Sequence, residues 1–239
     1  MRLLLILLFS SIFSYDNNAK IFSEMFDESG WKEVDKHSDS LVVYKKSIEQ
    51  SAIPAFKASM ISSVPMAYII EAVLDGENHE EFMGSSHVIE SEFVGEKRSD
   101  TTYCYQMLDL PFISDRHYIT TNFNDTIAVN SHYRLNWMVD NKKNYTDFTD
   151  FIDKKNEIHG DPIFISDGLG SWEIKLTDDH RTQINYYVLI DPGGWIPNAV
   201  VSYANKTLGP DTVIMMVQEG GRRFNADETP RHILFTLKS

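Results

Sequence analysis

Histidine, cysteine and serine residues are the first candidates for chemistry, and their spacing in this 239-residue chain matches no local catalytic or metal-binding pattern. The eight histidines include no His-x-x-x-His pair and no Cys/His cluster with zinc spacing. No Gly-x-Ser-x-Gly elbow is present, and Cys104, the sole cysteine, lies in a strand-like run. We therefore expect no metal site, no cofactor and no covalent catalysis. Acid–base pairs assembled from distant strands would leave no linear motif.

Two loops carry the most specific spacing in the chain. In the first, Pro192 fixes its own backbone angle, and Gly193 and Gly194 permit angles that other residues adopt only at a cost. Trp195 follows them and opens a long apolar segment. The second loop also follows an apolar run, and it reads Leu108-Asp109-Leu110-Pro111-Phe112-Ile113-Ser114-Asp115-Arg116.

Apolar periodicity predicts the elements that must position these loops. We expect paired strands at 41–46 and 55–62, then a helix at 65–74. Residues 196–224 carry a helical apolar stripe interrupted at Gly209-Pro210, which predicts a bent or two-piece helix. Residues 142–158 contain eight charged side chains and are expected to form a solvated insertion. Further strands are expected at 87–94, 100–108, 116–124, 131–139, 171–177 and 181–190.

This order of elements predicts an α+β fold in one domain. A curved antiparallel β-sheet would wrap around the long C-terminal helix, with a ligand cavity between them. Ala199, Ala204 and Val217 on the helix are small or medium in size. We therefore expect a dry, largely apolar cavity of several hundred cubic ångströms.

The segments Pro111 to Arg116 and Asp191 to Pro197 resemble those of START domains, the lipid-carrying modules related to the steroidogenic acute regulatory protein. His117 departs from the family pattern, which commonly has aspartate there. The resemblance implies a helix-grip fold, with residues 22–224 as the lipid-binding domain and 225–239 as a C-terminal tail.

The resemblance also implies ligand-binding residues. Arg116 would order a polar head group or pair with an interior carboxylate, unless it forms a strand-end salt bridge. Glu90 would face the cavity from the third strand. Gln106 and Asn136 fall where ceramide-transferring relatives present amides to the ligand. For these three, the alternative is a solvent-facing position on a strand.

The two loops would flank the cavity entrance and touch the membrane. Aromatic side chains suit the headgroup interface, although Phe112 and Trp195 could instead cap the core. The residues assigned to this role are Pro111, Phe112, Ile113, Gly193, Gly194 and Trp195.

Charge limits the partners. The formal net charge of −13 argues against nucleic acid and against lasting adhesion to anionic bilayers, so we expect only transient membrane contact. Residues 1–14 place Arg2 before an apolar run, which is typical of a signal peptide. We expect an exported monomer, periplasmic or secreted.

The sequence therefore predicts a protein that binds one amphipathic lipid, of the sterol, sphingolipid or phospholipid class. It would carry this lipid between membranes or present it to a partner. The alternatives are a helix-grip enzyme of the cyclase, aromatase or hydrolase type, and a lipid sensor that transfers nothing. A buried Arg, Glu or His beside the cavity would favour the enzyme, and a uniformly apolar tunnel the carrier.

Overall fold

One open β-sheet organises the part of the chain that the computed structural model describes, namely residues 17–95, 101–111, 113–128, 131–140, 148–194 and 208–230. Its strands follow the order β1-β2-β3-β10-β9-β7-β6-β5-β4 with antiparallel pairing, and β8 pairs with β6 in parallel. The strands are β1 (Lys32–Lys36), β2 (Leu41–Lys46), β3 (Ala55–Ser62), β4 (Val88–Phe93), β5 (Thr101–Leu108), β6 (Arg116–Asn124), β7 (His132–Val139), β8 (Ile163–Phe164), β9 (Asp167–Leu176) and β10 (Thr182–Asp191).

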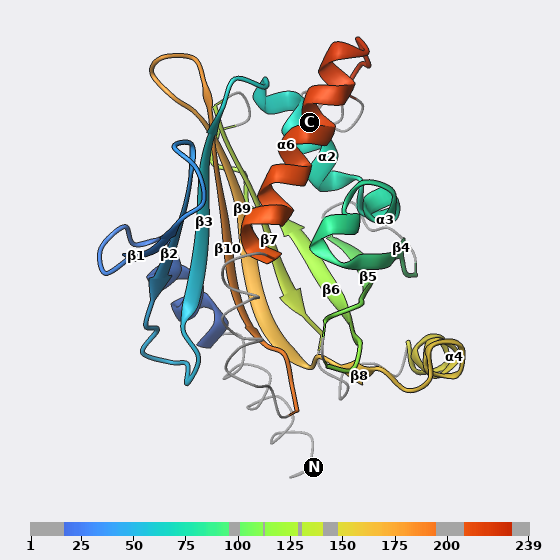
Figure 1. The fold of residues 1–239 in the computed structure, drawn as a ribbon. Coiled ribbons are helices and arrows are strands. Elements are labelled where there is room, and N and C mark those ends of the chain that lie inside the picture. The colour runs from blue at the N-terminus through green and yellow to red at the C-terminus, as the bar shows by residue number, and fades with distance from the viewer. Residues whose placement is uncertain are drawn as a thin grey trace, which may run out of the picture.

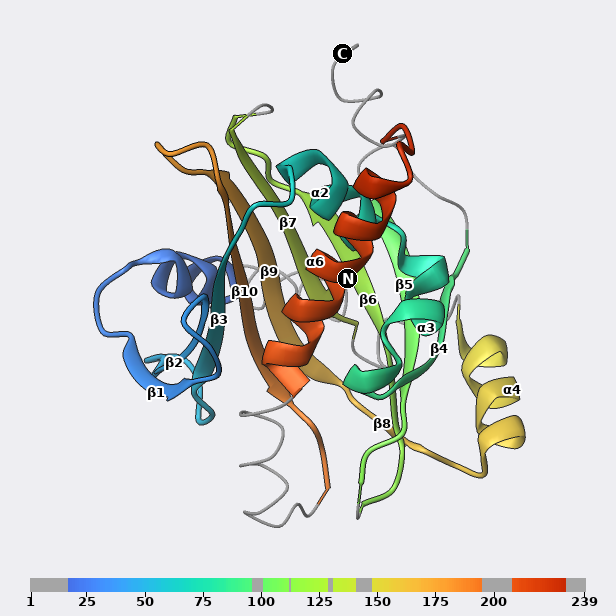
Figure 2. The same ribbon diagram turned by 45° about the horizontal axis from the view of Figure 1, so that its top comes forward.

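Helices cover both faces of this sheet. Helix α6 (Gly209–Asn225) lies across the concave face beside α2 (Met66–Leu74), as Figures 1 and 2 show. The segment between α2 and β4 contains the short helix α3 (His79–Phe82), flanked by the 3-10 turns η1 (Gly76–Asn78) and η2 (Gly84–Ser86). Helix α4 (Thr149–His159) packs near β5, and residues 17–26 form a helix on the convex face. Among the described residues, no helix combines the length and apolar character needed to cross a membrane.

The main core lies between α6, α2 and the concave face. Val213 and Met216 on α6 are buried against Ile69 on α2 and against Ile174 and Ile184 on the sheet. Full burial of one such side chain contributes about 1.5–3 kcal/mol. A second cluster on the convex face joins the helix at 17–26 to β9 and β10. Apolar side chains of helices therefore pack against both faces of the sheet.

Gly220 allows the two concave-face helices to approach closely. A Cβ atom at this position would lie 3.1 Å from the backbone oxygen of Tyr68 and from the backbone nitrogen of Ile69. Only a glycine lets α6 rest directly on the first turns of α2 without displacing backbone. This contact sets the position of α6 over the sheet.

The predicted fold class is confirmed, and the predicted strands match within a few residues. The C-terminal helix is described from Gly209, with Pro210 in its first turn, where its missing N–H costs nothing. Its expected first part, 196–207, lies outside the described residues, as do the expected signal peptide at 1–14 and most of the C-terminal tail.

The prediction for residues 142–158 was wrong in part. Thr149–His159 forms α4, and Ile152 and Phe151 pack against Tyr105 and its neighbours on the sheet. The many charges in this segment hid a short apolar stripe at helical spacing. Lys155 lies in this stripe and is buried, because its ammonium group is held by carboxylates of β4.

Candidate functional site

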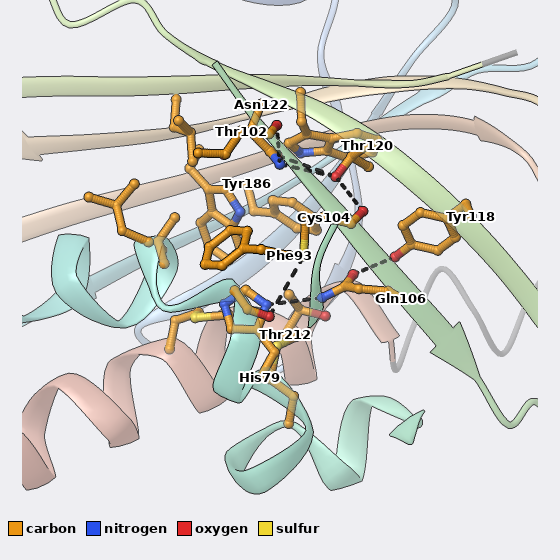
Figure 3. Close-up of a pocket in the computed structure, with 18 residues that line it drawn as sticks. His79, Phe93, Thr102, Cys104, Gln106, Tyr118, Thr120, Asn122, Tyr186 and Thr212 are labelled. Atoms are coloured by element: carbon orange, nitrogen blue, oxygen red, sulfur yellow. Dashed lines mark hydrogen bonds between the residues drawn. The ribbon is translucent and has the colours of Figure 1, made fainter. Parts of the chain in front are cut away.

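A small cavity lies between the concave face of the sheet and the helices α2, α3 and α6 (Figure 3). Its volume is about 80 Å³. Strands β4, β5, β6, β7, β9 and β10 contribute one wall, and Thr212 and Met216 of α6 contribute to the other. The lining residues are Val73, Leu74, Gly76, His79, Met83, Phe93, Thr102, Cys104, Gln106, Tyr118, Thr120, Asn122, Leu135, Trp137, Trp172, Tyr186, Thr212 and Met216.

The expected volume of several hundred cubic ångströms was wrong for this conformation. The small residues that motivated it were Ala199 and Ala204, which lie outside the described part of the chain, and Val217, which packs into the core. Large side chains of the sheet occupy the space instead. The rings of Trp172 and Tyr186 stack with centroids 4.3 Å apart, and Trp137 lies 6.4 Å from Tyr186.

A chain of hydrogen bonds forms one polar side of the cavity. The hydroxyl of Tyr118 donates to Gln106 Oε1 at 2.7 Å, and Gln106 Nε2 lies 3.0 Å from His79 Nδ1. His79 Nε2 lies 3.3 Å from the backbone oxygen of Ala72. These partners assign the neutral tautomer of His79, in which Nε2–H donates and Nδ1 accepts. Burial lowers the pKa of His79 to about 4.

Hydroxyl and thiol groups extend this polar side. Ser91 Oγ donates to the backbone oxygen of Gly76 and lies 3.4 Å from Gln106 Nε2. Cys104 is buried next to Ser91, and burial raises the pKa of its thiol to about 12. The thiol is therefore a neutral, unreactive part of the wall. Thr120 and Asn122 continue the row on β6, with Asn122 Nδ2 3.2 Å from Thr120 Oγ1.

Gln106 is the predicted ligand-binding residue that lines the cavity, as Figure 3 shows. Glu90 does not. It lies on the opposite face of β4, where its carboxylate accepts from Lys155 Nζ at 2.6 Å and lies 2.9 Å from His159 Nε2. A β-bulge between Val88 and Glu90 reverses the alternation along β4, so Val88 packs in the concave-face core while Glu90 points to the other face.

Asn136 is also not a cavity residue. Its neighbours Leu135 and Trp137 line the cavity, so alternation along β7 places the Asn136 side chain on the convex face. There it is buried, and its Nδ2 donates to Asp125 Oδ2 at 3.2 Å.

Arg116 joins the two loops and does not line the cavity. Its side chain is fully buried, with Nε donating to the Pro192 oxygen at 3.1 Å and Nη2 to the Gly193 oxygen at 3.4 Å. Nη1 donates to the backbone oxygen of Ser114. Among the described residues, backbone carbonyls of the two loops hold the guanidinium, where the sequence predicted an interior carboxylate or a strand-end salt bridge.

The predicted entrance residues are placed only in part. Gly193 and Gly194 adopt positive φ angles of 69° and 68°, which confirms the need for glycine in this loop. Pro111 and Ile113 are half-buried, and none of these four residues lines the cavity. Phe112 and Trp195 lie outside the described residues.

Several cavity residues were not predicted from the sequence. His79 lies on a four-residue helix between α2 and β4, too short to give a periodic signal. In the sequence, Tyr118 and Tyr186 cannot be distinguished from other strand residues. Within the described ranges, no group of three or more His, Cys, Asp or Glu side chains could hold a metal ion.

The arrangement of a curved antiparallel sheet around a C-terminal helix is the START-like helix-grip fold. Human StAR-related lipid transfer protein 5 matches with a TM-score of 0.70 at 10% identity, over 90% of this chain and 98% of that one. Human STARD10 matches with a TM-score of 0.66 at 18% identity, over 86% and 78%. A STAR-related lipid transfer protein fragment from Xanthomonas axonopodis matches with a TM-score of 0.63 at 15% identity, over 81% and 99%. Neither a family model nor a curated protein sequence matches this chain.

Proposed function

We propose that this protein binds one amphipathic lipid between the concave face of the sheet and α6. It carries this lipid between membranes or presents it to a partner. The observation that supports binding is the division of the cavity into two sides. Aromatic and aliphatic side chains such as Trp172 and Met216 form one, and the hydrogen-bonded row through Gln106 forms the other. An amphipathic molecule matches both sides at once.

Lipid binding requires this cavity to open further. Small-ligand sites occupy about 300–1,000 Å³, whereas this cavity has about 80 Å³. Met83 and Met216 line it, and unbranched methionine side chains repack readily. An outward shift of α6 would enlarge the space and leave the strand pairing intact. The described conformation is therefore the closed, unloaded one in this proposal.

Export and membrane contact belong to the same proposal. The apolar run after Arg2 supports export to the periplasm or the exterior. The net charge of −13 supports brief membrane contact through a few apolar residues, with Phe112 and Trp195 as the candidates.

An acid–base enzyme is the second candidate, because buried His79 lines the cavity. Its geometry favours a structural role. Both ring nitrogens already have partners, Gln106 at Nδ1 and the Ala72 oxygen at Nε2. A base at this position would have to break the Gln106 contact before it could accept a proton from a substrate.

Native mass spectrometry of freshly purified protein tests lipid binding. We expect a one-to-one complex that releases its lipid on denaturation. Thr212→Trp should prevent loading, because Thr212 lines the cavity from α6. Gln218→Trp is the matched control, since Gln218 is an exposed residue of the same helix. No bound lipid after purification and after incubation with mixed-lipid vesicles would contradict the proposal.

A further inference from the structure

We propose that the cavity selects uncharged lipids whose polar group is a hydroxyl or an amide, and that it rejects lipids whose buried group is a phosphate, sulfate or carboxylate. This inference rests on the proposed function of lipid binding, and it names the class of lipid. Three observations carry it: the charges around the cavity, the state of His79, and the acceptor atoms that face the interior.

The described part of the lining carries no formal charge. None of the eighteen lining residues is Lys, Arg, Asp or Glu. A buried phosphate or carboxylate needs a cation or several directed N–H donors, because removing the charge from water is costly. Without such partners, an anionic head group is more stable in the bilayer surface than in this cavity.

Two described cations close to lining residues, Arg223 beside His79 and Arg116 two residues before Tyr118, are already engaged. Arg223 on α6 donates from Nε to Glu219 Oε1 at 2.6 Å and from Nη2 to Asp75. Arg116 is held by backbone carbonyls at the loops. To serve an anionic ligand, either guanidinium would have to give up the hydrogen bonds that now hold it.

His79 is not a substitute cation. Its Nδ1 accepts from Gln106, and a proton added at this nitrogen would face the amide N–H group that now donates to it. Asp75 favours the charged imidazole, whereas burial and Arg223 oppose it. Burial is the largest influence and lowers the pKa to about 4. At neutral pH the ring is therefore uncharged.

Acceptor atoms on the polar side suit a ligand that donates. Tyr118 gives its only proton to Gln106, so its oxygen can still accept a hydrogen bond. The Gln106 side chain directs the N–H groups of Nε2 to His79 and Ser91. Its amide oxygen Oε1, which accepts from Tyr118, has a second lone pair that can accept a further hydrogen bond. A ligand hydroxyl or amide N–H placed here would find acceptors without displacing an existing bond. A phosphate oxygen would face lone pairs.

The test uses pairs of lipids that differ only in the polar group. Dioleoylglycerol is paired with dioleoyl phosphatidate, and cholesterol with cholesterol sulfate. Each pair is presented at equal amounts in phosphatidylcholine vesicles, and the loaded protein is separated and measured by native mass spectrometry. In the pair that loads, we expect the amount of protein bound to the uncharged lipid to exceed the amount bound to the charged lipid by about tenfold or more.

Two variants locate the selectivity. Gln106→Lys places a cation in the cavity and should shift the preference towards the charged member of the pair. Gln183→Lys is the matched control, because Gln183 is a half-buried residue of β10 outside the cavity. Tyr118→Phe is a milder variant that should lower the preference for hydroxyl lipids while keeping the ring.

The outcomes are distinguishable. Equal or preferred loading of phosphatidate, cholesterol sulfate or the carrier phosphatidylcholine would overturn the inference and leave lipid binding intact. Absence of all loading, with every probe, would overturn the proposed function itself. Unchanged selectivity in both folded cavity variants would show that the polar row does not select the ligand.

Discussion

The side chain of Arg116 donates a hydrogen bond from Nε to the backbone oxygen of Pro192 at 3.1 Å, and thereby joins two loops that are 76 residues apart in sequence. Gly193 and Ser114 supply further carbonyls to the same guanidinium. This contact makes Arg116 a residue that holds the loops in place. The polar side of the cavity is formed by other residues, on α3, β4, β5 and β6.

We therefore expect the main effect of Arg116→Leu to be a loss of folding stability and not a specific loss of lipid binding. The change removes three hydrogen bonds from a buried charged side chain to backbone carbonyls of the two loops, and hydrogen bonds to charged groups contribute about 1.5–3 kcal/mol each. Urea unfolding measures the loss, and Arg116→Lys, which can reach some of the same carbonyls, should lose less. Wild-type stability combined with abolished lipid binding would instead make Arg116 a ligand residue.

Glu173 should make stability depend on pH in the acidic range. Burial alone would raise its pKa, but hydrogen bonds from Arg134 and Asn185 and the charge of Lys175 outweigh burial and lower the pKa from 4.5 to about 2. A lowered pKa stabilises the folded state above the unfolded value, and this contribution is lost as the pH falls from about 4.5 towards 2. The free energy of unfolding should fall over this window by up to about 1.4 kcal/mol per pH unit from this group.

Glu173→Gln is the control for that dependence. It should be less stable than wild type near neutral pH, and its unfolding free energy should change less below about pH 4.5. The same slope in both proteins would assign the acid sensitivity to other carboxylates.

His79 should make the free energy of unfolding depend on pH in a second window, above that of Glu173. Its pKa falls from 6.5 to about 4 on folding, so protonation of the unfolded chain favours unfolding as the pH drops through this range. The contribution is about 3 kcal/mol between pH 7 and pH 4. His79→Gln should flatten the curve there, and an NMR titration of His79 with a midpoint near its unfolded value would contradict the buried neutral ring.

Glu90 should anchor α4 and leave ligand binding unaffected. It is paired with Lys155 and His159, and Lys155 also contacts Glu92. Glu90→Gln should therefore speed hydrogen exchange across residues 149–159 without changing lipid loading. Loss of lipid loading in Glu90→Gln with unchanged hydrogen exchange in α4 would instead assign Glu90 to the lipid-binding site.

Phe112 and Trp195 stay predicted membrane-contact residues. In a vesicle-to-vesicle assay, Phe112→Ala combined with Trp195→Ala should slow transfer severalfold while bound lipid stays bound. Transfer at the wild-type rate would refute this role. Loss of stability together with transfer would show that the two rings cap the core.

The sequence predicted the sheet well because its strands alternate regularly and end at Gly, Asn and Asp clusters. The prediction for Glu90 rested on the family resemblance and failed because a β-bulge, which periodicity does not reveal, turns Glu90 to the opposite face of the sheet. Asn136 failed for another reason. Alternation around Leu135 and Trp137 already pointed it away from the cavity, and the resemblance to other proteins overruled that pattern.

The role of His79 and the size of the cavity could not be predicted from the sequence, because both depend on three-dimensional packing. A histidine on a one-turn helix has no signature, and it becomes part of the site only because α3 brings it to Gln106 on β5. The space left under α6 depends on the rotamers of Trp137, Trp172 and Tyr186, which no local pattern reveals.

Photo-crosslinking tests most directly whether lipid occupies the space between the sheet and α6. Protein loaded with a diazirine analogue of the lipid found by native mass spectrometry is irradiated, digested and mapped. We expect crosslinks on the cavity-lining segments of β5, β6, β9 and β10 and on Thr212 and Met216 of α6. Crosslinks confined to the outer surface, such as the groove beside Lys32 and Lys45, would contradict lipid binding inside the fold.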